Sequence, residues 1–448
     1  MTLLARPESS HLANLDSFVP EPSRSWLEDL RRSGIERFKA VGLPDSTDEE
    51  WRYTTIWPVT RTSFKLAGRS EASEDFGRHT LGDDACCELV FVNGILDGRL
   101  SRTAGLPRGL SVLGLAEAAA DSPHLRHWLG RIAAIEANPF VALNTAFIRD
   151  GAFIHVARGA TIEKPVHLLF ISVGDEVPVV SHPRVFVLAE SGSVLPLVET
   201  YAGRGRGYLT NAVTEIHLGE QAQLDYNRLQ RESIESFHVS TTAVRLESGA
   251  DLVSHATTLG ARVTRNDLSA FFMGERAHAT VNGLVIIGGD QHADNHTLLH
   301  HEKPNCPSHE LYKHVLSDRA SGVFKGKIFV QKNAIGTDSK QTSKSLLLSD
   351  SAVMNSQPAL EIYADDVKCT HGSTTGPVDE DMVFYLRTRG VGVEAARHLL
   401  TYAFAADITR RIRVEPVRRR IEEFMAAQHD LPLDLRITDL GRHDEKSR

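Results

Sequence analysis

The residues best suited to chemistry in this chain lie in one stretch, Asp365–Gly376, which reads DDVKCTHGSTTG. It contains Cys369, one of four cysteines, with His371 two residues later. If the stretch is a strand, these two side chains share one face, roughly 7 Å apart at a rise of ~3.3 Å per residue. A thiolate and an imidazole so placed could both reach one soft metal ion. The alternative is a small buried cysteine beside a hydrogen-bonded turn histidine.

The cysteine inventory limits what such a site can be. The four cysteines are Cys86, Cys87, Cys306 and Cys369. They are too few for a disulfide framework in 448 residues, and no two have the CxxC spacing. A closed four-cysteine zinc or iron–sulfur site therefore cannot form within one chain. Any cluster would have to take ligands from a partner, or from oxygen and nitrogen groups.

The composition is that of a globular protein, with 41% hydrophobic and 24% charged residues. The formal net charge of −8 argues against nucleic-acid binding, which usually requires a basic surface. No run of about 18 apolar residues could span a membrane. The apolar run at the start is too short for a signal peptide, so we expect a cytoplasmic protein.

The N-terminal region predicts a small mixed α/β domain. A helix is expected over about 22–41, ended by Gly42 and Pro44. A short strand, Glu88–Gly94, ends in an Asn-Gly turn, and about 115–136 should form two helices. We find no pattern of catalytic or metal-binding residues in this region.

From Asn144 onward the helical periodicity disappears and a weak repeat takes its place. Each unit has a small residue at a turn, flanked by apolar runs; the small residues are Ala160, Ser193, Ala222, Ala250, Ala277, Ala320 and Ala352. Turns of nearly constant length with a small corner residue are typical of a β-solenoid. The alternative is a β-sandwich, whose strands usually turn every ~8–12 residues. The repeat favours the solenoid, whose exposed terminal coils need a cap or a partner.

One step of the repeat, from Ala277 to Ala320, is longer than the others and predicts an insertion. The segment NHTLLHHEKPNCPSHELYKH lies there. In and around it are Cys306 and six histidines: His292, His296, His300, His301, His309 and His314. A metal site is conceivable, but no HExxH pattern is present. We therefore interpret these residues as solvated loop histidines.

The chain becomes helical again after Gly376. A short helix is expected from Asp379 to Leu386, an amphipathic helix from Val393 to Ile408, and a third helix over about 414–428. These helices could cap the solenoid or dock a partner protein, and the sequence does not decide between the two. The expected domains are a helical or mixed α/β domain over 1–143, a β-helix over 144–376, helices over 377–430 and a disordered tail over 431–448.

Four stretches of the sequence resemble one known family. They are DEEWRYT, NPFVALNTAFIRDG, FYLRTRG and the long run FKGKIFVQKNAIGTDSKQTSKSLLLSDSAVMNSQPALEIYADDVKCTHGSTTG. They resemble the SufB/SufD family of SUF iron–sulfur cluster assembly scaffolds, from about Glu49 to Ile412. The segment around Cys369 is similar to DDVKCSHGATVG of the SufD branch, with Thr370, Ser373 and Thr375 as the differences.

The resemblance implies both a fold and a set of partners. The fold is a right-handed parallel β-helix between an N-terminal α/β domain and C-terminal helices. The partners are SufB, which pairs with the last β-helix strands, and the ATPase SufC, which docks on the C-terminal helices. The cargo is a transient iron–sulfur cluster shared with the partner, and a reduced flavin is associated with the complex, although no flavin motif is found here.

The resemblance also implies site residues. His371 matches the SufD histidine at the cluster-forming interface, and Cys369 matches the functional cysteine of SufB. Both are thus candidate iron ligands. The chain has no GxxxxGK[ST] loop, so we expect a scaffold subunit and not an enzyme.

Two alternatives remain open from the sequence. The first is a SufB-like scaffold that forms a homodimer and binds iron by itself. The second is a β-helix carbohydrate-active enzyme that uses carboxylates such as Glu361, Asp365 and Asp366. Adjacent carboxylates on a strand point to opposite faces, which argues against the enzyme.

Overall fold

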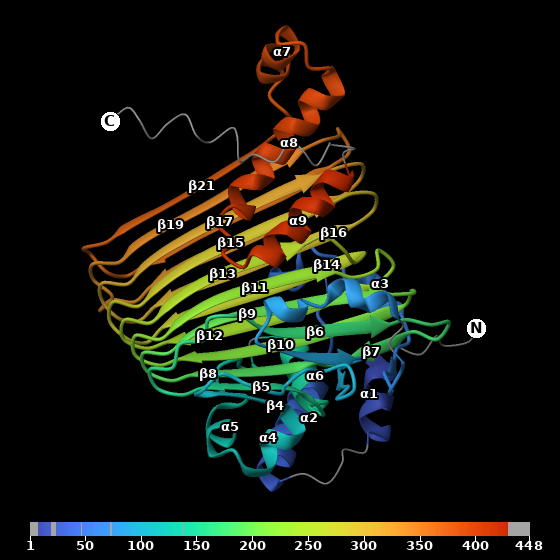
Figure 1. The fold of residues 1–448 in the computed structure, drawn as a ribbon, viewed down its shortest axis with the longest axis vertical. Coiled ribbons are helices and arrows are strands. Elements are labelled where there is room, and N and C mark those ends of the chain that lie inside the picture. The colour runs from blue at the N-terminus through green and yellow to red at the C-terminus, as the bar shows by residue number, and fades with distance from the viewer. Residues whose placement is uncertain (1–7, 19–23, 46, 72–73, 137, 429–448) are drawn as a thin grey trace.

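The computed structural model describes residues 8–18, 24–45, 47–71, 74–136 and 138–428. The expected disordered tail over 431–448 lies outside the described residues. Two stacked sheets of mostly parallel strands form a β-solenoid of about eight turns, as the repeat predicts (Figure 1). The mainly β fold, with an N-terminal α/β region and C-terminal helices, is confirmed.

Each turn of the solenoid contributes one strand to each sheet. In spatial order, the first sheet contains β4 (Leu110–Gly114), β5 (Gly151–Val156), β8 (Arg184–Ala189), β10 (Tyr208–Leu218), β12 (Phe237–Leu246), β14 (Val263–Phe272), β16 (His292–His301), β18 (Ser321–Val330) and β20 (Val353–Ile362). The short strand β7 (Val179–Ser181) also pairs with β10, and β1 (Lys65–Leu66) pairs with β7. The second contains β3 (Ile95–Leu96), β2 (Cys87–Val92), β6 (Val166–Val173), β9 (Val194–Arg204), β11 (Gln223–Arg231), β13 (Asp251–Thr258), β15 (His278–Ile287), β17 (Pro307–Leu316), β19 (Asp338–Leu347) and β21 (Lys368–Gly376). Strands β2 and β4, which precede the expected boundary at residue 144, pair with β6 and β5.

The corners of the solenoid explain the repeat and correct one expectation drawn from it. Ala277 and Cys306 are both fully buried and occupy the same corner on successive turns, before β15 and β17. Ala320 lies at the opposite corner, between β17 and β18. The long step is therefore about one and a half regular turns, and the predicted insertion is wrong. Both corners select small residues because the coil is narrow there, so the pattern alone could not separate them.

The six histidines near this step also differ from the expectation. They lie on the regular strands β16 and β17, not on a solvated loop. His301 and His314 are fully buried, and burial lowers the pKa of each to about 3, so both are neutral at pH 7.

Helices of the N-terminal region cover the outer face of the first sheet (Figure 1). They are α1 (Glu8–Ser17), α2 (Ser25–Val41), α3 (Trp57–Arg61), α4 (Leu115–Asp121), α5 (Pro123–Trp128) and α6 (Pro139–Ala146), with 3-10 turns at Glu49–Trp51, Glu74–His79 and Gly82–Asp84. The predicted helix over 22–41, the hairpin strand and the two helices within 115–136 all form. Asn93 and Gly94 make the hairpin turn between β2 and β3, both with positive φ.

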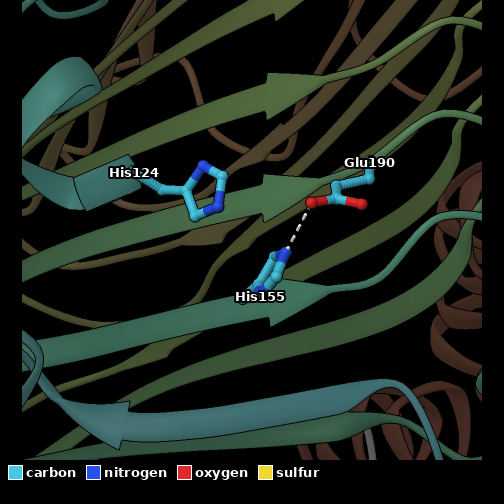
Figure 2. Close-up of side chains that lie close together, drawn as sticks. All are labelled: His124, His155 and Glu190. Carbon is cyan, nitrogen blue, oxygen red and sulfur yellow. Dashed lines mark hydrogen bonds and ion pairs between the residues drawn. The ribbon is translucent and has the colours of Figure 1, made fainter. Parts of the chain in front are cut away.

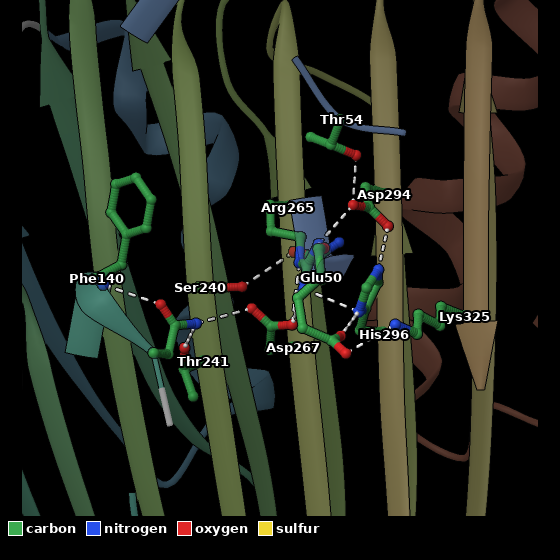
Figure 3. Close-up of polar contacts among 12 residues, drawn as sticks. Glu50, Thr54, Phe140, Ser240, Thr241, Arg265, Asp267, Asp294, His296 and Lys325 are labelled. Atoms are coloured by element: carbon green, nitrogen blue, oxygen red, sulfur yellow. Dashed lines mark hydrogen bonds and ion pairs between the residues drawn. The ribbon is translucent and has the colours of Figure 1, made fainter. Parts of the chain in front are cut away.

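The segment WRYT and the residue before it are held on the first sheet by a buried ionic cluster (Figure 3). The guanidinium of Arg265 on β14 donates to Asp294 Oδ2 and Asp267 Oδ1, each at 2.7 Å, and to the Glu50 carbonyl at 2.8 Å. Glu50 also pairs with Lys325 of β18 at 2.7 Å. Burial alone would raise the pKa of Asp294, but Arg265 holds it well below its usual range. The cluster therefore ties three successive turns to the N-terminal region.

The C-terminal helices are α7 (Glu380–Thr388), α8 (Val393–Thr409) and α9 (Glu415–Gln428). The apolar faces of α8 and α9 pack on the outer face of the second sheet, where Ala405, Ile408 and Ile421 meet Leu284 and Val315. These two helices thus cover a sheet face and not the open end of the solenoid. No helix in the described part of the chain is long and apolar enough to cross a membrane.

Candidate functional site

The solenoid ends in a coil that no other part of the described chain covers. Strand β20 pairs only with β18, and β21 pairs only with β19, so each is the edge strand of its sheet. Most residues of β21 are exposed and most of β20 are half-buried, whereas the interior strands before them are largely buried. The edge therefore presents free backbone hydrogen-bonding groups and the inner lining of a coil.

Cys369 and His371 both lie on β21, as the sequence predicts. Their register partners on β19 are Ser339 and Gln341, which are buried inside the coil. Because side chains alternate along a strand, Cys369 and His371 share the inner face. Cys369 is half-buried against the apolar core, and burial raises the pKa of its thiol. His371 is exposed at the open end. Their roles as ligands stay a prediction.

A line of polar residues extends from His371 into the solenoid. Glu310, Gln341 and His371 occupy the same register position on β17, β19 and β21. Gln341 Nε2 donates to Glu310 Oε2 at 2.7 Å. Glu310 is fully buried, and this burial raises its pKa to about 7. The carboxyl can thus gain or lose a proton near neutral pH, two turns below the exposed imidazole.

A second line of polar residues leads to Cys369. His301 Nε2 lies 3.1 Å from Ser308 Oγ, which lies 2.6 Å from Ser339 Oγ. Ser339 is the register partner of Cys369. The open end is therefore lined by a thiol and an imidazole and backed by buried groups that exchange hydrogen bonds.

Sequence reasoning missed Glu310, although the signal was present. Glu310, Gln341 and His371 are each about one turn apart, so the spacing of the repeat could have placed them in one line once the corners were assigned correctly. Of the carboxylates considered for an enzyme, Glu361 pairs with Lys327 at 2.8 Å. Asp365 and Asp366 lie in the corner before β21.

The exposed lining can supply two of the four ligands that an iron–sulfur cluster takes. A thiolate and a neutral imidazole are both soft enough for iron in such a cluster. The remaining ligands would have to come from another chain placed against the same edge.

Comparison with known proteins gives this arrangement a context. The chain matches two family models: "SUF system FeS cluster assembly, SufBD core domain" over residues 170–404 and "SufBD protein N-terminal region" over residues 11–168. The chain belongs to the SufBD family. The resemblance found in the sequence is thereby confirmed, and the core model covers the solenoid from β6 to α8.

Several known proteins are similar to this chain along most of their length. A SufBD family protein of Synechocystis is 32% identical, with 90% of this chain and 91% of the relative covered. The iron–sulfur cluster assembly protein SufD of Escherichia coli is 31% identical over 86% of this chain and 89% of its own. The chloroplastic protein ABCI7 of Arabidopsis thaliana is 30% identical over 88% and 84%. This SufBD protein is therefore related to SUF cluster-assembly proteins over nearly its whole length.

Proposed function

We propose that this SufBD protein is a non-catalytic scaffold subunit for iron–sulfur cluster assembly, and that it pairs with a SufB-type protein through β20 and β21. The observation that carries the proposal is the uncovered last coil, with His371 exposed on its inner face. A partner that added one strand to each sheet would pair the free backbone groups and cover the lining. The similarity to SufD supports this choice of partner.

The cluster is the cargo of this junction. His371, as a neutral imidazole, and Cys369 are the residues of this chain that would bind iron, and the partner would provide the remaining ligands, a cysteine among them. The raised pKa of the Cys369 thiol disfavours its thiolate form in the isolated chain. We therefore assign the first role to His371.

The C-terminal helices fit the docking of a SufC-type ATPase. Helix α7 lies beyond the last strands and exposes three large apolar side chains, Met382, Phe384 and Tyr385 (Figure 1). Next to it, α8 is anchored to β17, because Lys313 Nζ lies 2.9 Å from Asp407 Oδ2 and donates to the Phe404 carbonyl at 2.8 Å.

This anchoring gives a mechanical path for ATP-driven closure. Strand β17 carries Lys313 on its outer face and Glu310 on its inner face. A pull on α7 and α8 would thus act on the turn that holds the buried end of the line leading to His371. Movement there would open the junction so that His371 and a partner cysteine can receive iron and sulfur.

Replacement of the imidazole tests the site. We expect a complex with the SufB- and SufC-type proteins that carries His371→Ala to assemble normally but to lose most of its iron and sulfide under anaerobic reconstitution. Thr370→Ala is the matched control, because it is the neighbour on the opposite face of the same exposed strand. Cluster loading by His371→Ala at the rate of the unmodified complex would exclude this role.

Replacement of an exposed aromatic residue tests the docking of the ATPase. Phe384→Asp places a charge on α7 and should abolish co-purification of the SufC-type protein while pairing with the SufB-type protein is retained. Ile234→Asp is the control, since Ile234 and Phe384 are both 66% exposed. Unchanged ATPase recovery with Phe384→Asp would show that the ATPase binds elsewhere.

The alternative function to distinguish from this proposal is a scaffold that associates with a second copy of itself. In that case the isolated chain would sediment as a dimer and acquire a cluster without partners. Sedimentation and anaerobic iron content of the isolated chain measure both properties.

A further inference from the structure

A second group of metal-binding side chains lies at the other end of the solenoid. His124, His155 and Glu190 come from α5, β5 and the corner after β8, and their ligand atoms all lie within 4.8 Å of one another. His155 Nε2 is 3.0 Å from Glu190 Oε1, and the two imidazole rings are 5.3 Å apart between centroids. Figure 2 shows the three side chains converging from three separate segments. Among the described residues, this is the one place where three such ligands meet.

Local structure fixes each of the three residues. Helix α5 begins at Pro123, and the Ser122 side chain caps it by accepting a hydrogen bond from the Leu125 amide, which sets the direction of His124. Glu190 is held at its corner because its Oε2 accepts a hydrogen bond from the Arg158 amide at 3.0 Å. His155 belongs to a regular strand. The backbone at all three positions, and the paired His155 and Glu190 side chains, are therefore in place before any ion binds.

The donor set and its spacing fit a divalent transition ion. Metal–ligand bonds of about 2.0–2.1 Å in tetrahedral geometry place ligand atoms roughly 3.3 Å apart. His155 Nε2 and Glu190 Oε1 are already 3.0 Å apart, and all the ligand atoms lie within 4.8 Å of one another. Two imidazoles and one carboxylate are a usual three-ligand set for such ions, with further positions left for water. All three side chains are at least partly exposed, so an ion can enter from solvent.

We propose that His124, His155 and Glu190 bind one divalent first-row transition ion, Zn²⁺ or Fe²⁺, which ties helix α5 to the first turns of the solenoid. On binding, the hydrogen bond between His155 and Glu190 is exchanged for two metal–ligand bonds. The proton that the pair shared on His155 Nε2 moves to Nδ1 or to water. The site lies on the first strands of the parallel sheet and not on β21, so it is independent of the function proposed for the open end.

The ion would act as a structural clip. The three ligands join helix α5 of the N-terminal region to strand β5 and to the corner that follows β8, the strand paired with β5. An ion that binds the folded protein and not the unfolded chain stabilises the fold in proportion to its free concentration. Binding should therefore raise the melting temperature and need not affect cluster assembly.

Metal titration of the full-length protein tests the site. The probes are Zn²⁺ by calorimetry, Co²⁺ by its visible d–d absorption, and Fe²⁺ under anaerobic conditions. We expect His124→Ala to lose one equivalent of bound ion relative to the unmodified chain. It should also lose the zinc-dependent rise in melting temperature, which we expect to be about 2–4 °C.

Two further variants separate this site from other histidines and from the open end. His127→Ala is the matched control, because His127 is an exposed histidine on the same helix; it should retain the full stoichiometry. Cys369→Ser changes the open end of the solenoid, so it should still bind the equivalent of metal ion that His124→Ala loses. Equal stoichiometry in His124→Ala and the unmodified chain would overturn the proposal, as would loss of the same equivalent in His127→Ala. If His124→Ala loses one equivalent of only one of the two ions, Zn²⁺ or Fe²⁺, that ion is the one that the site selects.

Discussion

The two ends of the solenoid are built differently, because the strands at the N-terminal end precede the repeat and those at the C-terminal end belong to it. At the N-terminal end the second sheet finishes with the two-residue strand β3 and the first with β4, and both are antiparallel to their neighbours. The inner residues there, such as Leu89 and Phe91, are buried, and Phe91 stacks on Phe170 at 4.7 Å. At the C-terminal end two full-length strands finish the sheets, and the inner face carries His371 in solvent.

This difference indicates at which end the sheets are closed by the chain itself and at which end their edges are left open. A short antiparallel strand ends a sheet because it leaves little free edge for another chain. A long parallel edge strand does the opposite, since it presents a full row of unpaired groups. The polar lining at the open end, with Glu310 buried beneath it, also differs from the apolar closed end. The difference agrees with our proposal that a partner chain assembles on the open end, whereas the closed end needs none.

The largest expected effect concerns the ionic cluster that holds the N-terminal region on the sheet. Arg265→Met removes the guanidinium that pairs with buried Asp294 and leaves this carboxylate only Thr54 and His296 as partners. We therefore expect a loss of about 3–5 kcal/mol in the free energy of unfolding. Chemical denaturation measures it. The control is Arg319→Met, which removes an equally close but exposed pair with Asp290 and should leave stability nearly unchanged. Equal losses of stability in Arg265→Met and Arg319→Met would show that a buried pair is no more important to the free energy of unfolding than an exposed one.

A matched pair of leucines compares the two ends directly. Leu89 is buried on the inner face of β2, and Leu360 is half-buried on the inner face of β20. Leu89→Ala should cost about 3 kcal/mol through lost packing and the cavity left behind, whereas Leu360→Ala should cost about 1 kcal/mol in the isolated chain. In the complex with the SufB-type partner, the cost of Leu360→Ala should increase. If Leu360→Ala lowers the free energy of unfolding of the isolated chain as much as Leu89→Ala does, the two ends are equally well packed and the comparison fails.

The smallest expected effect depends on pH and reports the buried acid near the open end. Burial raises the pKa of Glu310 in the folded state to about 7, above its value in the unfolded chain. The unfolded chain therefore releases this proton first, and stability falls as pH rises from about 4 to about 7. The glutamine of Glu310→Gln cannot ionise, so the stability of this variant relative to the unmodified chain should be roughly 2 kcal/mol more favourable at pH 8 than at pH 5. A difference that does not change between these two pH values would contradict the raised pKa.

Much of the fold could be predicted because its signals are local. Small residues at tight corners, alternating strands and the Asn93-Gly94 turn each depend on neighbours in sequence. The shared face of Cys369 and His371 followed from the period of a strand, on the condition that this stretch forms one. The family motifs then indicated which kind of solenoid this is, a parallel β-helix of the SufB/SufD family.

The remaining features depend on contacts that the sequence does not encode locally. Ala277 and Ala320 are equally small, and only the three-dimensional path shows that they occupy opposite corners. Glu310 becomes part of the site only through its register with Gln341. His124 approaches Glu190 because α5 folds back onto the first turns of the solenoid, and no spacing in the chain indicates this.

The central claim is that β20 and β21 are completed by a SufB-type partner. Amide hydrogen exchange of the isolated chain and of the purified complex measures this directly, because exchange reports whether edge amides are hydrogen-bonded. We predict that amides of β20 and β21 exchange at least about tenfold more slowly in the complex, while those of β2 to β4 do not change. A stable complex in which β20 and β21 exchange as fast as in the isolated chain would contradict the account.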